Sequence, residues 1–281
     1  MLFISPRIRR LIDMAIDEDE VGFDVASAVF FEGEEVAARM VAKESLVVAG
    51  LDVVEAVFER VDPKVRWSFE VEDGQRVEAG DVIGRAEGLA ISVLRAERVA
   101  LNFLQRMSGI ATKTARYVQA LGDSDTRIVD TRKTLPGYRE LDKYAVRCGG
   151  GANHRFNLSG GVMIKDNHIA AAGGSIAEAV RRAKERAPLT LKIEVEVTDF
   201  DQLEEALDAG ADVVMLDNMA TDQMREAVRR VREHSGDRVA VEASGNITVE
   251  RLPELADLGL DYISSGALTH SIEAADISMK F

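Results

Sequence analysis

From Thr126 onward, short apolar runs alternate with amphipathic helical segments, and this alternation limits the possible folds more than any other feature. We interpret the apolar runs as seven strands, at residues 127–130, 145–148, 162–165, 191–197, 213–217, 239–243 and 262–264. Helices between them are predicted to begin at caps such as Ser175, which is followed three positions later by Glu178. Strands that alternate with helices form parallel sheets, so the pattern predicts a closed or nearly closed (β/α) barrel.

The first hundred residues show a mixed α/β pattern instead. The elements expected before the barrel are helices over 7–17, 52–61 and 94–121, and strands over 36–43 and 46–49. Residues 71–83 hold two short β segments around glycine turns, which predict a structural hairpin. The long helix is expected to link the two halves of the chain.

Polar residues stand at the carboxyl end of one predicted strand after another. They are Asp130-Thr-Arg-Lys, Lys165-Asp-Asn-His, Glu194 and Glu196, Asp217-Asn218, Ser244-Gly245 and Ser265-Gly266. In (β/α) barrels the loops at that end of the strands carry the active site. A single polar strand end is compatible with a cap or a solvated turn, but six in succession predict a site.

The charge of this region differs from that of the whole chain. The net charge is −14, yet residues 130–168 hold seven Lys and Arg against four Asp and Glu. An acidic molecule repels nucleic acid, whereas a local cationic island attracts a small anion. Arg132, Arg155 and Lys165 suit carboxylates, because guanidinium groups bind them through two hydrogen bonds. The overall acidity fits either ordinary solubility or a salty cytoplasm.

Carboxylates at the ends of two successive predicted strands form a second group. Glu196 and Asp217 are 21 positions apart and suit a hard divalent cation, with water in between. Glu194 shares a strand face with Glu196, so either glutamate suits the role of ligand. The Ser-Gly pairs at 244–245 and 265–266 open helices, where backbone N–H groups bind phosphate. Dicarboxylate, metal and phosphate sites together predict transfer chemistry on a phosphorylated sugar.

The cellular setting is constrained by what the sequence does not contain. No window approaches the roughly 18 apolar residues of a membrane span, and the start lacks a secretory apolar core. Cys148 is the only cysteine, which excludes an internal disulfide and fits a reducing cytoplasm. We expect Cys148 to be a small buried residue rather than a nucleophile.

The motif series resembles that of the quinolinate phosphoribosyltransferase family, the decarboxylating nicotinate-nucleotide pyrophosphorylases. In chain order the motifs are ERVALNFLQRMSGIAT, DTRKTLPG, GGGANHR, IKDNH, EVEV, LDNM, EASGNI and SSGALTHS. They follow the family's order over essentially the whole chain, and their combination is specific where a short piece alone is not. The resemblance implies that quinolinate and phosphoribosyl pyrophosphate give nicotinate mononucleotide, pyrophosphate and carbon dioxide, with Mg²⁺, in de novo NAD biosynthesis.

The resemblance also implies an α/β architecture, with an N-terminal α/β sandwich domain followed by an open seven-stranded (β/α) barrel. We place the sandwich at residues 1–110, joined by the C-terminal segment 270–281, and the barrel at 111–269. The implied assembly is a cytoplasmic homodimer, or a higher homo-oligomer built from it, in which each sandwich domain covers the mouth of the partner's barrel.

Roles for individual residues follow from the same resemblance. The quinolinate-binding residues would be Arg98, Arg132, His154, Arg155 and Lys165. The residues for phosphoribosyl pyrophosphate would be Lys133, Glu196, Asp217, Ser244, Gly245, Ser265, Gly266 and His270. Arg98 would reach across from the partner subunit. Glu196 and Asp217 would also take the metal, and the 21-residue spacing fits Glu196 better than Glu194.

Other polar residues have simpler explanations. His168 suits a site or a scaffold role equally, and His234 suits a solvated helix end. Lys143 is expected on a helix surface, Asp166 as a loop-shaping carboxylate, and Arg106 in a salt bridge.

Two rival functions remain at this point. Lys165 at a strand end is compatible with a Schiff-base lyase, although neighbouring arginines favour anion binding. The other rival is a relative of the same fold found beside molybdate transport genes, or a sensor of phosphorylated sugars without catalysis. Borohydride trapping with a keto substrate tests the first rival, and turnover of quinolinate tests the second.

Overall fold

The structure is a computed structural model that describes residues 1–281. The chain forms two compact units. The first comprises Met1–Ala115, Thr134–Gly150 and Leu268–Phe281, and the second comprises Arg116–Lys133 and Gly151–Ala267. The division differs from the expected boundary after residue 110, because 134–150 also belongs to the first unit. None of the helices combines the length and the apolar character that crossing a bilayer requires.

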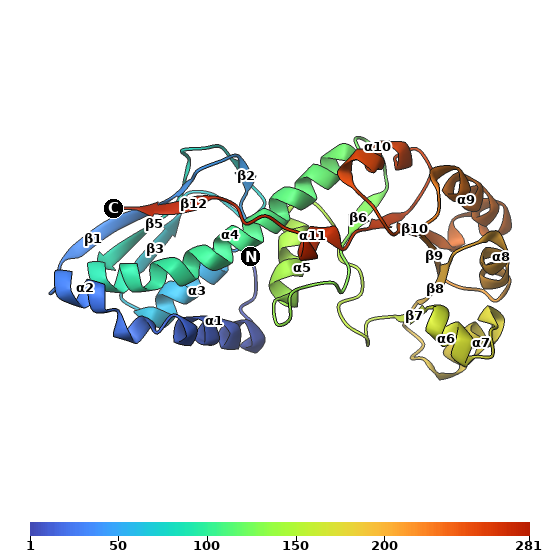
Figure 1. The fold of residues 1–281 in the computed structure, drawn as a ribbon, viewed down its shortest axis with the longest axis horizontal. Coiled ribbons are helices and arrows are strands. Elements are labelled where there is room, and N and C mark those ends of the chain that lie inside the picture. Colours follow the sequence, from blue (N-terminus) through green and yellow to red (C-terminus); the bar gives the residue numbers. More distant parts are fainter. The chain divides into compact units, whose positions relative to one another are not determined.

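The first unit is built on an antiparallel sheet with helices along it (Figure 1). Its elements are α1 (Pro6–Glu18), η1 (Val21–Phe23), α2 (Val25–Phe30), β1 (Glu35–Ala42), β2 (Leu46–Val47), α3 (Leu51–Val61), β3 (Arg66–Phe69), β4 (Arg76–Val77), β5 (Val82–Leu89), α4 (Ala90–Ala120), α5 (Arg139–Cys148), α11 (Ala267–His270) and β12 (Ile277–Lys280). Helices α4 and α11 extend beyond the unit at one end. The strand order in the sheet is β12-β1-β5-β3.

Local sequence explains the main elements of this unit. On β1 the side chains of Ala38, Met40 and Ala42 are buried while Arg39 is exposed, which is the alternation of a half-buried strand. Helix α3 buries its apolar residues, as expected for 52–61. The C-terminal segment joins the unit because β12 pairs with β1, and because Gly109 on α4 leaves room for the Glu273 carbonyl.

The expected hairpin at residues 71–83 is wrong in its pairing. Both β segments form, but β4 pairs with β2, and β5 pairs with β1 and β3. A glycine turn reverses the chain direction but does not determine which strands pair with each other. Tertiary packing determines the pairing here.

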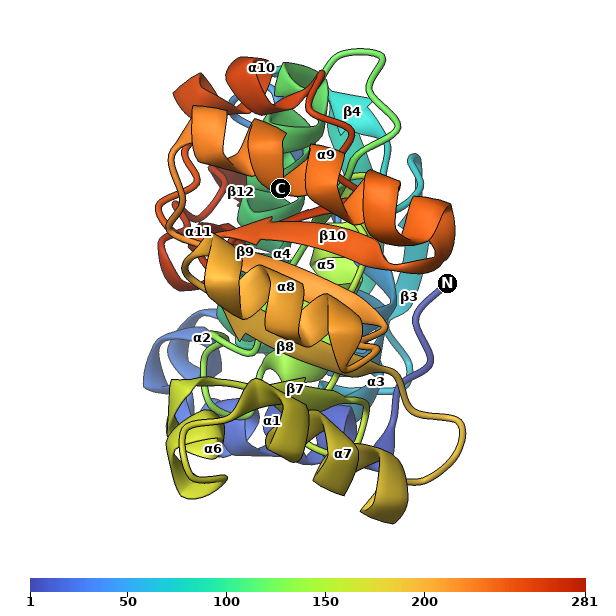
Figure 2. The ribbon, with the colours of Figure 1, turned by 90° about the vertical axis from the view of Figure 1, so that its right-hand side faces the viewer.

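The second unit holds a parallel sheet whose outer face is covered by helices, as Figure 2 shows for α8 and α9. Its elements are β6 (Arg127–Val129), β7 (Val162–Ile164), α6 (Asp166–Ala171), α7 (Ile176–Arg186), β8 (Ile193–Val197), α8 (Phe200–Asp208), β9 (Val213–Asp217), α9 (Thr221–Ser235), η2 (Gly236–Arg238), β10 (Ala240–Ser244), η3 (Val249–Arg251), α10 (Leu252–Leu255) and β11 (Tyr262–Ser264). The strand order is β6-β11-β10-β9-β8-β7, so β6 and β7 are the two edges.

The sheet has six strands rather than the expected seven. Residues 145–148 are the last turn of helix α5, which buries Leu141, Tyr144, Ala145 and Val146. A four-residue apolar run fits a helix and a strand equally well, and only the preceding residues reveal the helical spacing. Beside β6, the missing strand is reduced to a single parallel bridge between Ala152 and Val129.

Candidate active site

Alternation along the parallel strands gathers polar side chains on the inner face of the second unit. The register places Glu196 beside Met215, and Met215 beside Glu242. Because strand side chains alternate in direction, Asp217 and Ser244 point to the same side two residues further on. A cavity of about 230 Å³ lies at these strand ends. The predicted residues that line it are Arg132, Lys133, His154, Arg155, Lys165, Glu196, Asp217 and Ser244.

Arg155 contributes a cation whose hydrogen bonds go to neutral groups. Its guanidinium donates to the carbonyl of Gly161 at 3.1 Å and to the sulfur of Met163 at 3.5 Å. Burial lowers the pKa of Arg155, and the nearby Arg132 cation lowers it further. Two guanidinium groups that repel each other in one cavity favour an anion between them.

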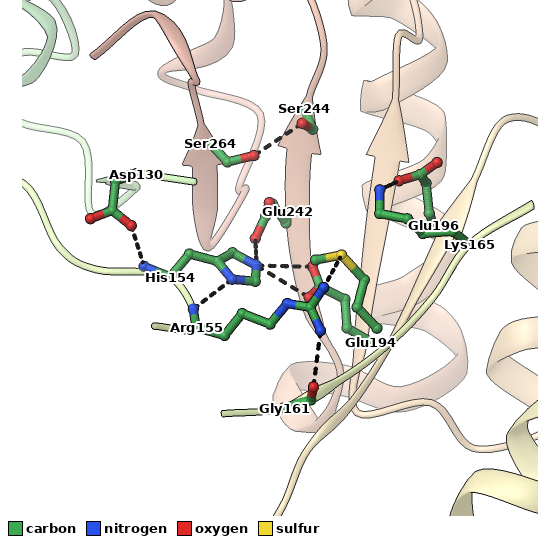
Figure 3. A network of polar contacts seen from close by, with 11 residues as sticks. Asp130, His154, Arg155, Gly161, Lys165, Glu194, Glu196, Glu242, Ser244 and Ser264 are labelled. Carbon is green, nitrogen blue, oxygen red and sulfur yellow. Dashed lines mark hydrogen bonds and ion pairs between the residues drawn. The ribbon is translucent and has the colours of Figure 1, made fainter. Parts of the chain in front are cut away.

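Lys165 and Glu196 meet at the ends of β7 and β8. The Lys165 ammonium forms an ion pair with the Glu196 carboxylate, which is drawn in Figure 3. Asp217, half-buried at the end of β9, accepts a hydrogen bond from Asn218 at 2.8 Å. Glu196 and Asp217 thus offer hard oxygen donors on adjacent strands, which is the donor chemistry that fits Mg²⁺.

The half-buried His154 and the buried Glu194 and Glu242 form a cluster (Figure 3). The ring nitrogen Nε2 of His154 lies 3.2 Å from Glu194 Oε2 and 3.4 Å from Glu242 Oε2. The other ring nitrogen, Nδ1, accepts the backbone N–H of Arg155 at 2.6 Å. Glu194 is therefore committed to His154, whereas Glu196, two residues further along β8, pairs with Lys165.

The protonation of this cluster follows from its contacts. Burial raises the pKa of Glu194, and the adjacent Glu242 carboxylate also raises it. For His154, burial alone would lower the pKa, but hydrogen bonds to both glutamates outweigh it and raise the pKa. The Arg155 N–H opposes that rise, because it points at Nδ1, where the second ring proton would sit. In either charge state Nε2 carries a hydrogen.

The same three residues have the composition of a metal site, with ligand atoms all within 4.8 Å of one another. Metal binding needs the lone pair of Nε2 and a hydrogen on Nδ1. The contact between Nδ1 and the Arg155 N–H requires the opposite arrangement. The cluster is thus better described as a hydrogen-bonded support for the loop that carries Arg155.

Asp130 anchors the same loop from the other side. This fully buried carboxylate accepts the His154 backbone N–H at 3.0 Å and the Asn153 side-chain N–H at 2.6 Å. Sequence reasoning placed Asp130 among the polar strand ends without a role, and it did not single out Glu242 at all. The signal for Glu242 was its inward position two residues before Ser244 on a predicted strand.

Small residues close the cavity on the side of β10 and β11. The Ser264 hydroxyl donates to the Ser244 hydroxyl at 3.0 Å. The Ser265 backbone N–H donates to the Val129 carbonyl at 3.1 Å, which leaves that N–H engaged within the sheet. Gly245 has a φ of +88°, a conformation that favours glycine.

Of the predicted residues, Gly245, Ser265 and Gly266 do not line this cavity, and neither do Arg98 and His270. Arg98 and His270 belong to the first unit, where Arg98 is exposed on α4 and the Nδ1 atom of His270 lies 2.7 Å from the Ser271 hydroxyl. Arg106 forms the expected salt bridge, with Asp142 at 3.0 Å. Lys143 is buried, so its expected place on a helix surface is wrong.

The remaining histidines have scaffold contacts. Nδ1 of His168 accepts the Lys165 backbone N–H at 3.1 Å and so caps helix α6. His234 is exposed near the end of α9, with its Nε2 atom 3.2 Å from Asp208 Oδ1. Cys148 is half-buried, and burial raises the pKa of its thiol to about 12, which fits the expectation that it is not a nucleophile.

Family models match nearly the whole chain. The model of the quinolinate phosphoribosyl transferase N-terminal domain matches residues 24–108, and that of the C-terminal domain matches residues 110–280.

Individual relatives agree with the family models. A probable nicotinate-nucleotide pyrophosphorylase [carboxylating] from Bacillus subtilis is 44% identical over 97% of this chain and 93% of its own length. A quinolinate phosphoribosyltransferase [decarboxylating] from Nicotiana tabacum is 39% identical over 97% of this chain and 82% of its own. The crystal structure of NadC from Streptococcus pyogenes superposes with a TM-score of 0.94 at 42% identity, over 100% of this chain and 98% of that one.

Proposed function

The chain belongs to the quinolinate phosphoribosyltransferase family, and we infer that it converts quinolinate and phosphoribosyl pyrophosphate into nicotinate mononucleotide, pyrophosphate and carbon dioxide in NAD biosynthesis. The observation that carries this function is the make-up of one cavity. It combines a group of cations, two carboxylates at adjacent strand ends and the serines Ser244 and Ser264.

The cations are proposed to bind quinolinate. Arg132, Arg155 and Lys165 would hold its two carboxylates, with His154 holding the Arg155 loop in place beside them. Their charges offset the repulsion between two polyanionic substrates in one cavity. Nicotinate has a single carboxylate and needs fewer cations, so this cation set supports selectivity for the dicarboxylate.

The carboxylates and the turns are proposed to bind phosphoribosyl pyrophosphate. Glu196 and Asp217 would face the ribose hydroxyls and hold Mg²⁺, with water in between. The turns at 244–245 and 265–266 would bind the 5-phosphate, and Lys133 and His270 would contact the phosphate groups. When bound, Mg²⁺ supplies charge that offsets the developing charge of pyrophosphate.

The chemistry then depends on alignment more than on proton transfer. The pyridine nitrogen attacks the anomeric carbon as pyrophosphate leaves, through a transition state with oxocarbenium character. Alkylation makes the ring cationic, so the carboxylate next to the nitrogen leaves as carbon dioxide and its electron pair stays on the ring carbon. That carbon then takes a proton from solvent water. Holding the reactants in line is the contribution expected of the rigid strand ends.

We further propose that the protein works as a homodimer in a reducing cytoplasm. Large apolar side chains are exposed at the start of the chain, with Phe3 and Phe23 80% exposed and Phe30 75% exposed. Exposed apolar groups of this size favour an interface between subunits. The homodimer would also bring Arg98 of one subunit to the cavity of the other.

Turnover tests the proposed function directly. Purified protein with Mg²⁺, phosphoribosyl pyrophosphate and quinolinate should release pyrophosphate and carbon dioxide in equal amounts. Nicotinate in place of quinolinate should give far less pyrophosphate. Binding of both substrates without turnover would instead favour a sensor of phosphorylated sugars.

A further inference from the structure

Asn218, an exposed residue directly after β9, makes three hydrogen bonds that join two parts of the proposed site. Its side-chain nitrogen donates to Asp217 Oδ2 at 2.8 Å. Its side-chain oxygen accepts from the Asn246 amide at 2.9 Å, and its backbone N–H donates to the Ser244 carbonyl at 2.9 Å. Asn218 therefore ties the carboxylate at the end of β9 to the turn that follows β10.

The turn after β10 is packed directly against the Asn218 side chain. A Cβ atom added to Gly245 would lie 2.3 Å from Asn218 Oδ1 and 2.4 Å from its Cγ. Asn218 and Asn246 both have left-handed backbones, with φ of 55° and 49°, and asparagine tolerates this region better than most residues. Glycine at 245 thus allows the positive φ at this position and also leaves room for the Asn218 amide.

We propose that Asn218 is a positioning residue for phosphoribosyl pyrophosphate, which fixes the Asp217 carboxylate relative to the phosphate-binding turn at 244–245. This inference rests on the proposed function, which assigns the ribose and the metal to Asp217 and the 5-phosphate to the turn. A hydrogen bond to a carboxylate selects one of its orientations, and outer contacts of this kind commonly decide how well a ligand group is presented. Asn218 acts through Asp217 and the turn, so it requires no contact with the substrate.

The first experiment replaces Asn218 in three ways. Asn218→Gly keeps the left-handed backbone accessible and removes only the side chain. Asn218→Asp keeps the shape but replaces the donor to Asp217 with a repelling carboxylate, and Asn218→Ala adds backbone strain. All three should raise the KM for phosphoribosyl pyrophosphate by roughly tenfold or more, because at least one hydrogen bond to a carboxylate is lost. The KM for quinolinate should stay within about twofold of the wild-type value, because the lost hydrogen bond supports only the binding of phosphoribosyl pyrophosphate.

The second experiment uses the close approach of Gly245 to Asn218. Gly245→Ala should raise the KM for phosphoribosyl pyrophosphate, because its Cβ displaces the Asn218 amide. Gly174→Ala is the matched control, since Gly174 has a φ of +85° and nothing within 4 Å of an added Cβ. In the Asn218→Gly background, Gly245→Ala should add no more than Gly174→Ala does. Equal effects of Gly245→Ala in both backgrounds would overturn the inference, because Gly245 would then act independently of Asn218.

Binding measurements separate this inference from the function on which it rests. Calorimetry with ribose 5-phosphate and without metal should show weaker binding to Asn218→Gly than to the wild type, at an unchanged melting temperature. If the wild type turns over quinolinate but Asn218→Gly leaves both KM values unchanged, or raises both equally, only the positioning role fails. If the wild type neither binds ribose 5-phosphate nor turns over quinolinate, the proposed function itself fails.

Discussion

The ammonium group of Lys165 and the carboxylate of Glu196 form an ion pair at the ends of adjacent strands. The two groups are proposed for different ligands: Lys165 would bind quinolinate, and Glu196 would bind Mg²⁺ and the ribose. Each charge partly neutralises the other, so a cation that competes for Glu196 leaves Lys165 available to an anion. The ion pair therefore couples the two halves of the site, and such coupling is reciprocal.

Glu196→Gln should strengthen quinolinate binding measured without metal. The reason is that the substitution removes the carboxylate that competes with quinolinate for Lys165. The same substitution should raise the KM for phosphoribosyl pyrophosphate. Calorimetric titration of quinolinate into the wild type and the variant checks this expectation. Lys165→Ala is the control, since it should weaken quinolinate binding in either background. Weaker quinolinate binding to Glu196→Gln would contradict the coupling.

The alternation of strands and helices after residue 126 predicted the parallel sheet and the end of it that gathers the polar groups. The sequence did not predict which side chains on neighbouring strands contact each other, because these contacts depend on the register of the strands. Glu194 and Glu196 share a strand face, and only the family resemblance favoured Glu196 as the ligand. In the structure Glu194 contacts His154, whereas Glu196 pairs with Lys165. The four-residue run 145–148 carried no information that separates a helix turn from a strand.

Arg155→Ala should raise the KM for quinolinate by roughly 10- to 100-fold, with little change in the KM for phosphoribosyl pyrophosphate. A charge-assisted hydrogen bond from Arg155 to quinolinate would contribute roughly 1.5–3 kcal/mol. The hydrogen bonds that the Arg155 guanidinium makes within the protein go to a carbonyl and a sulfur, so its charge is available to the ligand. Arg155→Lys keeps the charge without the planar fork and should recover only part of the affinity. Comparable turnover of nicotinate and quinolinate by the wild type would refute the assignment.

Glu242→Gln should make stability less dependent on pH. The pKa of Glu194 is raised in the folded protein, so stability is lost as pH rises from its unfolded pKa through its folded pKa. The pKa of His154 is raised as well, and its contribution is also lost on raising the pH. Glu242 contributes to both pKa shifts. The free energy of unfolding, measured with urea, should therefore differ less between pH 5 and pH 8 in the variant than in the wild type.

The exposed Glu204→Gln substitution on α8 provides the control for loss of one negative charge. In this control the free energy of unfolding should differ between pH 5 and pH 8 by as much as it does in the wild type. An equal reduction in both variants would show that net charge, rather than the buried cluster, sets the pH dependence.

Molar potassium chloride should change the melting temperature by no more than a few degrees. The charged helices pair their own residues, as in Arg181 with Glu178 at 2.7 Å and Arg229 with Glu226 at 2.7 Å. Exposed pairs contribute little and are screened by salt, while screening also relieves repulsion within a protein of net charge −14. A large rise in melting temperature would instead indicate adaptation to a salty cytoplasm.

A shared active site makes a prediction about mixtures of inactive proteins. Arg98 lies on α4 in the first unit, whereas Lys165 lines the cavity of the second unit. If Arg98 of one subunit serves the other, Arg98→Ala and Lys165→Ala should each be nearly inactive alone. In a mixed dimer one site then carries both changes and the other carries neither. An equal mixture, unfolded and refolded together, should therefore approach roughly a quarter of wild-type activity, given two-fold symmetry. Confirmed mixed dimers that stay inactive would place Arg98 in its own subunit's site or outside any site.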